Sequence, residues 1–128
     1  MTTTAWAHLP NAVHIDRVIA SAKANPEQWA DSWDTTWSAV EDVAITAARD
    51  LLIKQGRYSV WVESRKAVWN AVRESGRWAI LALIAYDDCA YMLDSAPSEL
   101  AILAALGDNR AIILLPACKV LHSNKELT

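Results

Sequence analysis

Hydrophobic residues recur along most of the chain at steps of three and four, which is the spacing of one face of an α-helix. The clearest stretch is 26–55, where Pro26 suits a first helical turn and Gly56 follows where a left-handed C-cap belongs. Its predicted inner face consists of Trp29, Trp33, Trp37, Val40, Ala44, Ala47 and Leu51. The pattern therefore predicts one long helix over these residues.

A second long helix is predicted from residue 59 to residue 93. Its apolar stripe consists of Val68, Val72, Gly76, Ala79, Leu83, Tyr86, Ala90 and Leu93. Gly76 costs about 1 kcal/mol of helix propensity relative to alanine. We therefore expect either that a neighbouring helix approaches closely at Gly76 or that the helix breaks there.

Shorter helices are predicted on both sides of these two. One covers residues 11–24 and is capped by Asn11, another covers 96–106, and a last one is capped by Asp108 and kinked or ended by Pro116. No stretch has the alternation of a strand, and three glycines and four prolines are few for a sandwich or barrel. The predicted fold is all-α, a compact bundle of about five helices built on two long antiparallel helices.

A length of 128 residues indicates one domain. We expect an N-terminal arm over residues 1–10, with Trp6 and Leu9 available to dock, a helical domain over 11–121, and a polar C-terminal tail over 122–128.

The charge and composition limit the classes of partner that we expect for this protein. The net charge of −3 gives no reason to expect nucleic acid, and the apolar run 78–86 falls short of the ~20 residues of a membrane span. Cys89 and Cys118 form no CxxC motif, so we expect free thiols and no metal site. Free thiols are typical of the reducing cytoplasm, so we expect a cytoplasmic protein. We also expect no cofactor. A hydrophobic content of 53% exceeds the usual ~45–50%, which favours a homo-oligomer that hides apolar surface.

Seven tryptophans and three tyrosines occur with no phenylalanine. Indole and phenol rings carry a polar edge that needs a hydrogen-bond partner, so they suit pockets and interfaces as well as cores. For Trp29, Trp33 and Trp37, on the predicted inner face, we favour the core.

Trp61, Arg65, Trp69, Arg73 and Arg77 form a stripe at helical spacing beside the core face. Guanidinium groups bind phosphate through paired donors and indoles stack on bases, so this stripe is a candidate nucleotide site. Cation–π contacts and salt bridges within the protein explain the same residues, and no glycine-rich phosphate loop accompanies them.

Asp87 and Asp88 interrupt an apolar run in the second predicted long helix. A buried carboxylate must be paired, protonated or bound to a cation. We expect Asp87 to be the buried one, paired with Arg49 or Arg73. The alternative is a metal-dependent hydrolase site that adds an acid from the helix over 26–55, although no companion acid motif is present.

The Ala-, Trp- and Asp-rich spacing of residues 29–79, followed by the segment 82–94 (ALIAYDDCAYMLD), resembles small bacteriophage-encoded helical proteins of unknown function. The resemblance covers residues 29–120. It supplies no catalytic residues, and it implies an accessory protein that acts on a host protein in the bacterial cytoplasm.

No catalytic motif is present, since His8, His14 and His122 lie far apart with no nucleophile beside them. We therefore expect a non-catalytic binding protein that acts by occupancy, either on a host protein through an exposed Trp-rich or Leu/Ile-rich helical face or by self-assembly. The alternative is a protein that sequesters a small nucleotide at the Arg/Trp stripe.

Overall fold

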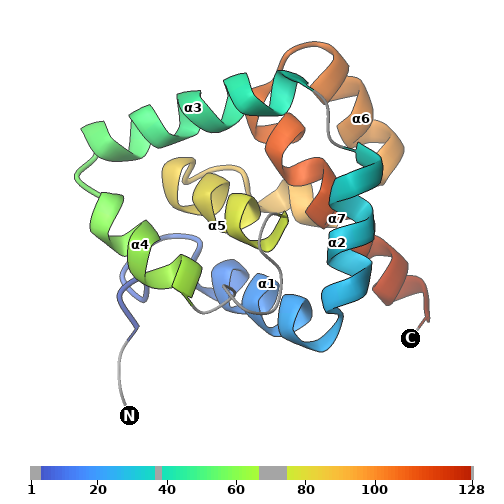
Figure 1. Cartoon of the computed structure of the whole chain (residues 1–128), viewed down its shortest axis with the longest axis horizontal. Helices are drawn as coiled ribbons and strands as arrows, with labels where there is room; N and C mark the ends of the chain where they lie inside the picture. Colours follow the sequence, from blue (N-terminus) through green and yellow to red (C-terminus); the bar gives the residue numbers. More distant parts are fainter. Residues whose placement is uncertain (1–3, 37–38, 67–74, 128) are drawn as a thin grey trace.

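The structure is a computed structural model that describes residues 4–36, 39–66 and 75–127, and every regular element in these ranges is a helix (Figure 1). In chain order the elements are α1 (Ala12–Ala24), α2 (Pro26–Thr36), α3 (Ala39–Lys54), α4 (Tyr58–Lys66), α5 (Ser75–Ala85), the 3-10 helix η1 (Ala90–Asp94), α6 (Pro97–Ala105) and α7 (Asn109–Leu127). The predicted all-α class is confirmed for this part of the chain.

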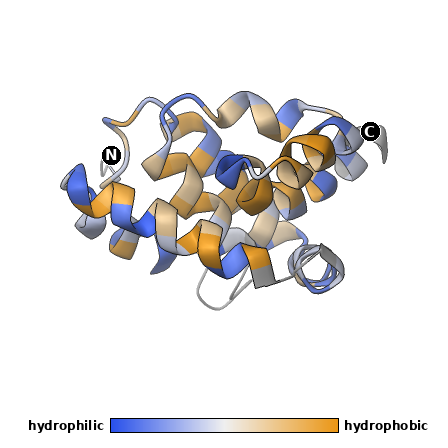
Figure 2. Cartoon of the chain, turned by 90° about the horizontal axis from the view of Figure 1, so that it is seen from above, coloured by the Kyte–Doolittle hydropathy of each residue, from blue (hydrophilic) through white to orange (hydrophobic). Residues whose placement is uncertain are grey.

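Helix α5 lies at the centre of the molecule. It contacts α1, α2, α3, α4 and α7, with α3 crossing above it and α1 below it in the view of Figure 1. All of its residues from 79 to 85 are at most 1% exposed. A helix that is apolar on every side must be surrounded by other elements, and hydrophobic residues accordingly gather in the middle of the molecule (Figure 2).

The two predicted long antiparallel helices are not confirmed. The stretch 26–55 contains α2 and α3, which run in different directions (Figure 1). The stretch 59–93 contains α4, α5 and η1, and α5 ends at Ala85. Gly76 is buried in the first turn of α5, and residues 67–74 before it lie outside the described ranges.

The end of α5 is held by side chains from distant parts of the chain. The four carbonyl oxygens of residues 83–86 each accept a hydrogen bond of 2.9 Å from such a side chain. The donors are Asn11, Gln55 and Arg57. The last carbonyls of a helix have no partner within the helix, and leaving them buried and unpaired is costly. These donors therefore stabilise the stop at Ala85.

Local signals placed other helix ends correctly. Gly56 has φ +72° and Gly107 has φ +89°, the left-handed conformation of a helix C-cap. The Asp108 side chain accepts a hydrogen bond of 3.0 Å from the backbone N–H of Arg110, so it caps α7 as predicted. Pro116 does not end that helix, which continues to residue 127.

The two ends of the chain belong to the packed structure. Trp6 and Leu9 are 8% and 7% exposed, so the arm docks on the core, and the Trp6 indole donates to Asp16 at 2.8 Å. The predicted polar tail begins inside α7, which covers residues 122–127.

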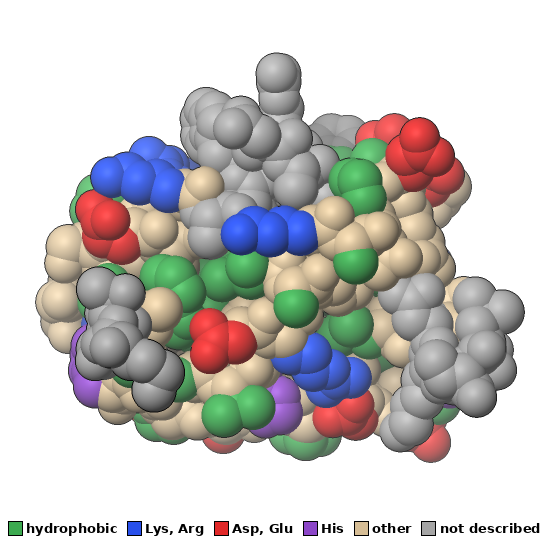
Figure 3. All heavy atoms as spheres, turned by 90° about the horizontal axis from the view of Figure 1, so that it is seen from below, with side chains coloured by type: hydrophobic (Ala, Val, Ile, Leu, Met, Phe, Trp, Pro, Cys, Tyr) green, Lys and Arg blue, Asp and Glu red, His purple; other side chains and the backbone are tan. Residues whose placement is uncertain are grey.

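The surface is of mixed character. Seen from below, basic and acidic side chains are interspersed with small hydrophobic patches (Figure 3). Within the described ranges, no helix combines the length and the apolar character needed to cross a bilayer.

Candidate arginine–tryptophan site

Two of the three tryptophans on the predicted inner face belong to the core. Trp29 is fully buried and Trp33 is 8% exposed, as expected, while Trp37 lies outside the described residues. The Trp29 indole donates to the Ser21 hydroxyl at 3.0 Å. Its polar edge therefore has a hydrogen-bond partner on α1.

The candidate Arg/Trp stripe is divided between two helices. Trp61 and Arg65 lie on α4 and Arg77 lies on α5, whereas Trp69 and Arg73 fall outside the described residues. The Arg65 guanidinium carbon lies 4.7 Å from the centroid of the Trp61 ring. Because α4 and α5 pack together, the three described members still meet at one place.

Two further residues contact Trp61 in this region, and the sequence analysis did not predict either of them as a site residue. Trp78, on α5, stacks on Trp61 with a centroid distance of 6.0 Å and an interplanar angle of 22°. The Arg49 guanidinium carbon, from α3, lies 5.7 Å from the Trp61 ring and 5.8 Å from the Trp78 ring. Arg77 lies 5.7 Å from the Trp78 ring. We call these five residues, Arg49, Trp61, Arg65, Arg77 and Trp78, the arginine–tryptophan cluster.

The sequence pattern points to Trp78 but not to Arg49. Trp78 directly follows Arg77 at the end of the predicted stripe, so it was within reach of the pattern. Arg49 is on a different helix, and no spacing along the chain connects it to Trp61.

Two hydrogen-bond donors of the cluster have no acceptor among the described residues. The Nε1 atom of Trp61, a residue only 2% exposed, and the Nε atom of Arg49 are both buried without a hydrogen-bond partner in the described part of the chain. Neither Arg49 nor Arg65 forms an ion pair with a described carboxylate. A buried donor without an acceptor costs about 1–3 kcal/mol, so these two donors are unfavourable for the stability of the cluster.

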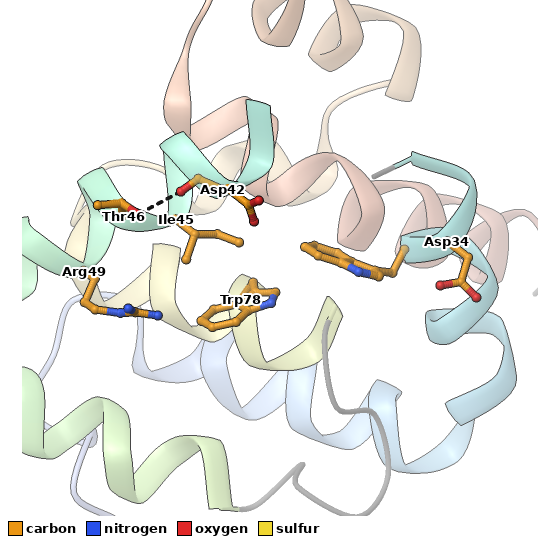
Figure 4. Close-up of a pocket in the computed structure, with 7 residues that line it drawn as sticks. Asp34, Asp42, Ile45, Thr46, Arg49 and Trp78 are labelled. Carbon is orange, nitrogen blue, oxygen red and sulfur yellow. Dashed lines mark hydrogen bonds between the residues drawn. The ribbon is translucent and has the colours of Figure 1, made fainter. Parts of the chain in front are cut away.

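A pocket of about 540 Å³ opens beside the cluster, between α2, α3 and α5 (Figure 4). Its lining residues are Trp33, Asp34, Asp42, Ile45, Thr46, Arg49 and Trp78. Arg49 and Trp78 belong to both the cluster and the pocket. The volume lies within the ~300–1,000 Å³ of small-molecule sites.

The prediction that Asp87 is buried is wrong. Both residues lie in the turn after α5, and their side chains are 49% and 78% exposed. Asp87 pairs with Arg57 at 2.7 Å, and not with Arg49; Arg73, the other expected partner, lies outside the described residues. The helix ends before these residues, so the turn carries both carboxylates to the surface.

Asp88 and its neighbours form an ion-pair network. Arg110 lies 3.3 Å from Asp88 and 2.9 Å from Asp108. The hydrogen bond from Arg110 lowers the pKa of the Asp108 carboxyl, which keeps it ionised. Among the described residues, no three His, Cys, Asp or Glu side chains form a group that can hold a metal ion.

The two cysteines are free and buried. Burial raises the pKa of Cys89 to about 12 and that of Cys118 to about 11, because a thiolate is poorly solvated there. Their thiols donate to the backbone oxygens of Ala82 and Ser95 at 3.5 and 3.1 Å. A thiol held protonated in this way is a poor nucleophile.

Comparison of the chain with protein-family models, with curated proteins and with solved structures finds no match in any of the three. The resemblance to small phage proteins stays a prediction.

Proposed function

We propose that this protein is a non-catalytic binding protein whose ligand is a small nucleotide, with a planar base and an anionic phosphate. The site is the arginine–tryptophan cluster together with the adjoining pocket. The observation that carries the proposal is the position of Arg49, which faces both stacked indoles, lines the pocket and has no ion-pair partner among the described carboxylates.

The chemistry of the lining suits such a ligand. A guanidinium donates two parallel hydrogen bonds to a phosphate, and these bonds are stronger than neutral ones. An aromatic side chain stacks on a nucleobase with about 1–3 kcal/mol per base. The pocket offers both groups, Arg49 and Trp78, within one opening of about 540 Å³.

The test is equilibrium dialysis of the full chain against nucleoside mono-, di- and cyclic phosphates. We expect at least one nucleotide to bind, and Arg49→Ala to weaken it by about tenfold or more, the effect of one charge-assisted hydrogen bond. Lys54→Ala is the matched control, because it removes an exposed cation from the same helix outside the pocket. Binding that is unchanged in Arg49→Ala, or no binding of any nucleotide, refutes the proposal.

A second function, occupancy of a protein partner, is favoured by the outer face of α6. Ile102 and Leu106 are 62% and 79% exposed, and Ala101 and Ala105 beside them are exposed as well. These residues follow one another at helical spacing, so they form a continuous apolar stripe of the Leu/Ile-rich kind. The partner is either a second copy of the chain or the host protein that the phage resemblance implies.

Sedimentation velocity at increasing protein concentration tests self-assembly through this stripe. If α6 is the interface, the double variant Ile102→Lys, Leu106→Lys stays monomeric where the parent chain associates. Val13→Lys is the control, because Val13 is 76% exposed on α1, outside the stripe. Association that survives the double variant excludes α6 as the self-interface.

A further inference from the structure

The pocket has two chemically different ends on one helix. Asp42 and Arg49 both line it from α3 and are seven residues apart, which is two helical turns. At about 1.5 Å of rise per residue they are separated by about 10 Å along the helix axis. Ile45 and Thr46 lie between them, and Trp78 faces them from α5 (Figure 4). A ligand in the pocket therefore meets a carboxylate at one end, a ring in the middle and a guanidinium at the other end.

No cation of the described residues pairs with the carboxylates at the acidic end. Asp34 and Asp42 are exposed, and neither forms an ion pair within the described part of the chain. Among the described residues, four other acids each pair with an arginine; they are Asp87, Asp88, Asp94 and Asp108. An ionised carboxylate only accepts hydrogen bonds, so this end suits a ligand edge that carries N–H donors.

The basic end suits an anion. The Arg49 guanidinium packs on two indole rings, which orients it without using its charge in an ion pair to a described residue. A phosphate that approaches this end gains charge-assisted hydrogen bonds. The same phosphate at the acidic end is repelled by Asp34 and Asp42, so the two ends also fix the direction in which a ligand lies.

We propose that the pocket binds a guanine nucleotide, with Asp42 accepting hydrogen bonds from the base edge and Arg49 holding the phosphate. The proposal rests on the nucleotide-binding function proposed above. Guanine presents two adjacent donors, N1–H and the 2-amino group, which match the two oxygens of one carboxylate. Adenine and cytosine pair each amino donor with a ring acceptor, and uracil flanks its N–H with two carbonyls. In these three bases an acceptor would lie against a carboxylate oxygen, which is also an acceptor, so the two groups repel and stay unpaired. Unpaired polar groups of this kind make a binding site reject a similar ligand.

The experiment is isothermal titration of the full chain with guanosine 5′-monophosphate, adenosine 5′-monophosphate and guanosine. We expect the guanine nucleotide to bind about tenfold or more tightly than the other two, since each of them lacks one polar anchor. Asp42→Asn, which keeps the shape but loses the charge, lowers the preference for guanine over adenine and leaves the affinity for the adenine nucleotide nearly unchanged. Arg49→Gln weakens both nucleotides equally and leaves guanosine unaffected.

Asp50→Asn is the matched control, because Asp50 is an exposed acid of α3 outside the pocket, and circular dichroism confirms that each variant is folded. Equal binding of the two nucleotides, or a guanine preference that survives Asp42→Asn, overturns the assignment of the base while nucleotide binding itself stands. Guanosine that binds as tightly as its monophosphate overturns the role of Arg49. If neither nucleotide nor guanosine binds, the inference fails, and a negative result in the wider dialysis series shows that the proposed function fails too.

Discussion

The side-chain nitrogen of Asn11 lies 2.9 Å from the backbone oxygen of Leu83, so the start of α1 caps the end of α5. The same nitrogen donates to the oxygen of Tyr86 at 2.9 Å, and Asn11 is only 4% exposed. Asn11 occupies the N-cap position of α1 but makes no side-chain capping bond there. The Asn11 amide therefore caps the end of α5 and does not cap α1.

Asn11→Ala is expected to lower the free energy of unfolding by about 2–3 kcal/mol, because the buried carbonyl of Leu83 loses its side-chain donor and the half-buried carbonyl of Tyr86 loses one of its two donors. Urea denaturation followed by circular dichroism measures the change. Asn25→Ala is the comparison, since Asn25 makes one half-buried bond of 3.1 Å to Ser21. It should lose about 1 kcal/mol or less. Equal losses in the two variants contradict the capping role of Asn11.

Arg57 is expected to contribute more to the stability of the fold than its ion-pair partner, Asp87. Its guanidinium donates to the backbone oxygen of Ile84 at 2.9 Å as well as to Asp87 at 2.7 Å. Arg57→Ala should cost about 2 kcal/mol, because it removes a donor from the end of α5. Asp87→Asn should cost about 0.5 kcal/mol or less, because the carboxylate is half exposed and water screens the pair. Thermal unfolding of both variants tests the order, and a larger loss in Asp87→Asn refutes it.

Gly56→Ala tests the energetic cost of the left-handed backbone conformation between α3 and α4. Nothing lies within 4 Å of the Cβ that alanine would add, so the change creates no clash. The φ of +72° is unfavourable for residues with a Cβ, and we expect a loss of about 1–2 kcal/mol. Asn tolerates this conformation better, so Gly56→Asn should lose less in the same denaturant titration. If asparagine is as destabilising as alanine, the backbone explanation fails.

The buried thiols predict a loss of stability at alkaline pH. Burial raises the pKa of Cys89 from 9.0 to about 12 and that of Cys118 from 9.0 to about 11, so the unfolded chain ionises first. The contribution of each thiol is complete below pH 9 and decreases as pH rises toward its folded pKa. The slope is about 1.4 kcal/mol per pH unit for each thiol.

Urea denaturation between neutral and alkaline pH measures that slope. The double variant Cys89→Ala, Cys118→Ala removes both thiols and should show a shallower decline than the parent chain. An identical decline in the parent chain and the double variant rules out the thiols as the cause.

Part of the candidate site could be predicted from the sequence. Trp61, Arg65 and Arg77 were candidates because helical spacing placed them on one stripe, and the structure brings these three together. Arg49 was not a candidate as a site residue, since its contact with Trp61 joins two helices. Asp87 was placed in the core because an apolar run surrounds it, and nothing nearby in the chain showed that α5 ends first.

The sequence by itself determined the helical class, the left-handed turn at Gly56 and the cap at Asp108. Each of these depends on interactions between residues a few positions apart, which local patterns record. Only the tertiary structure decided where α5 ends and which charge lies beside Trp78. These depend on hydrogen bonds and ring contacts between residues far apart in the chain, such as Asn11 with Leu83 and Arg49 with Trp78. Such contacts form only once the helices have packed, because the cost of burying a carbonyl or a guanidinium depends on what surrounds it.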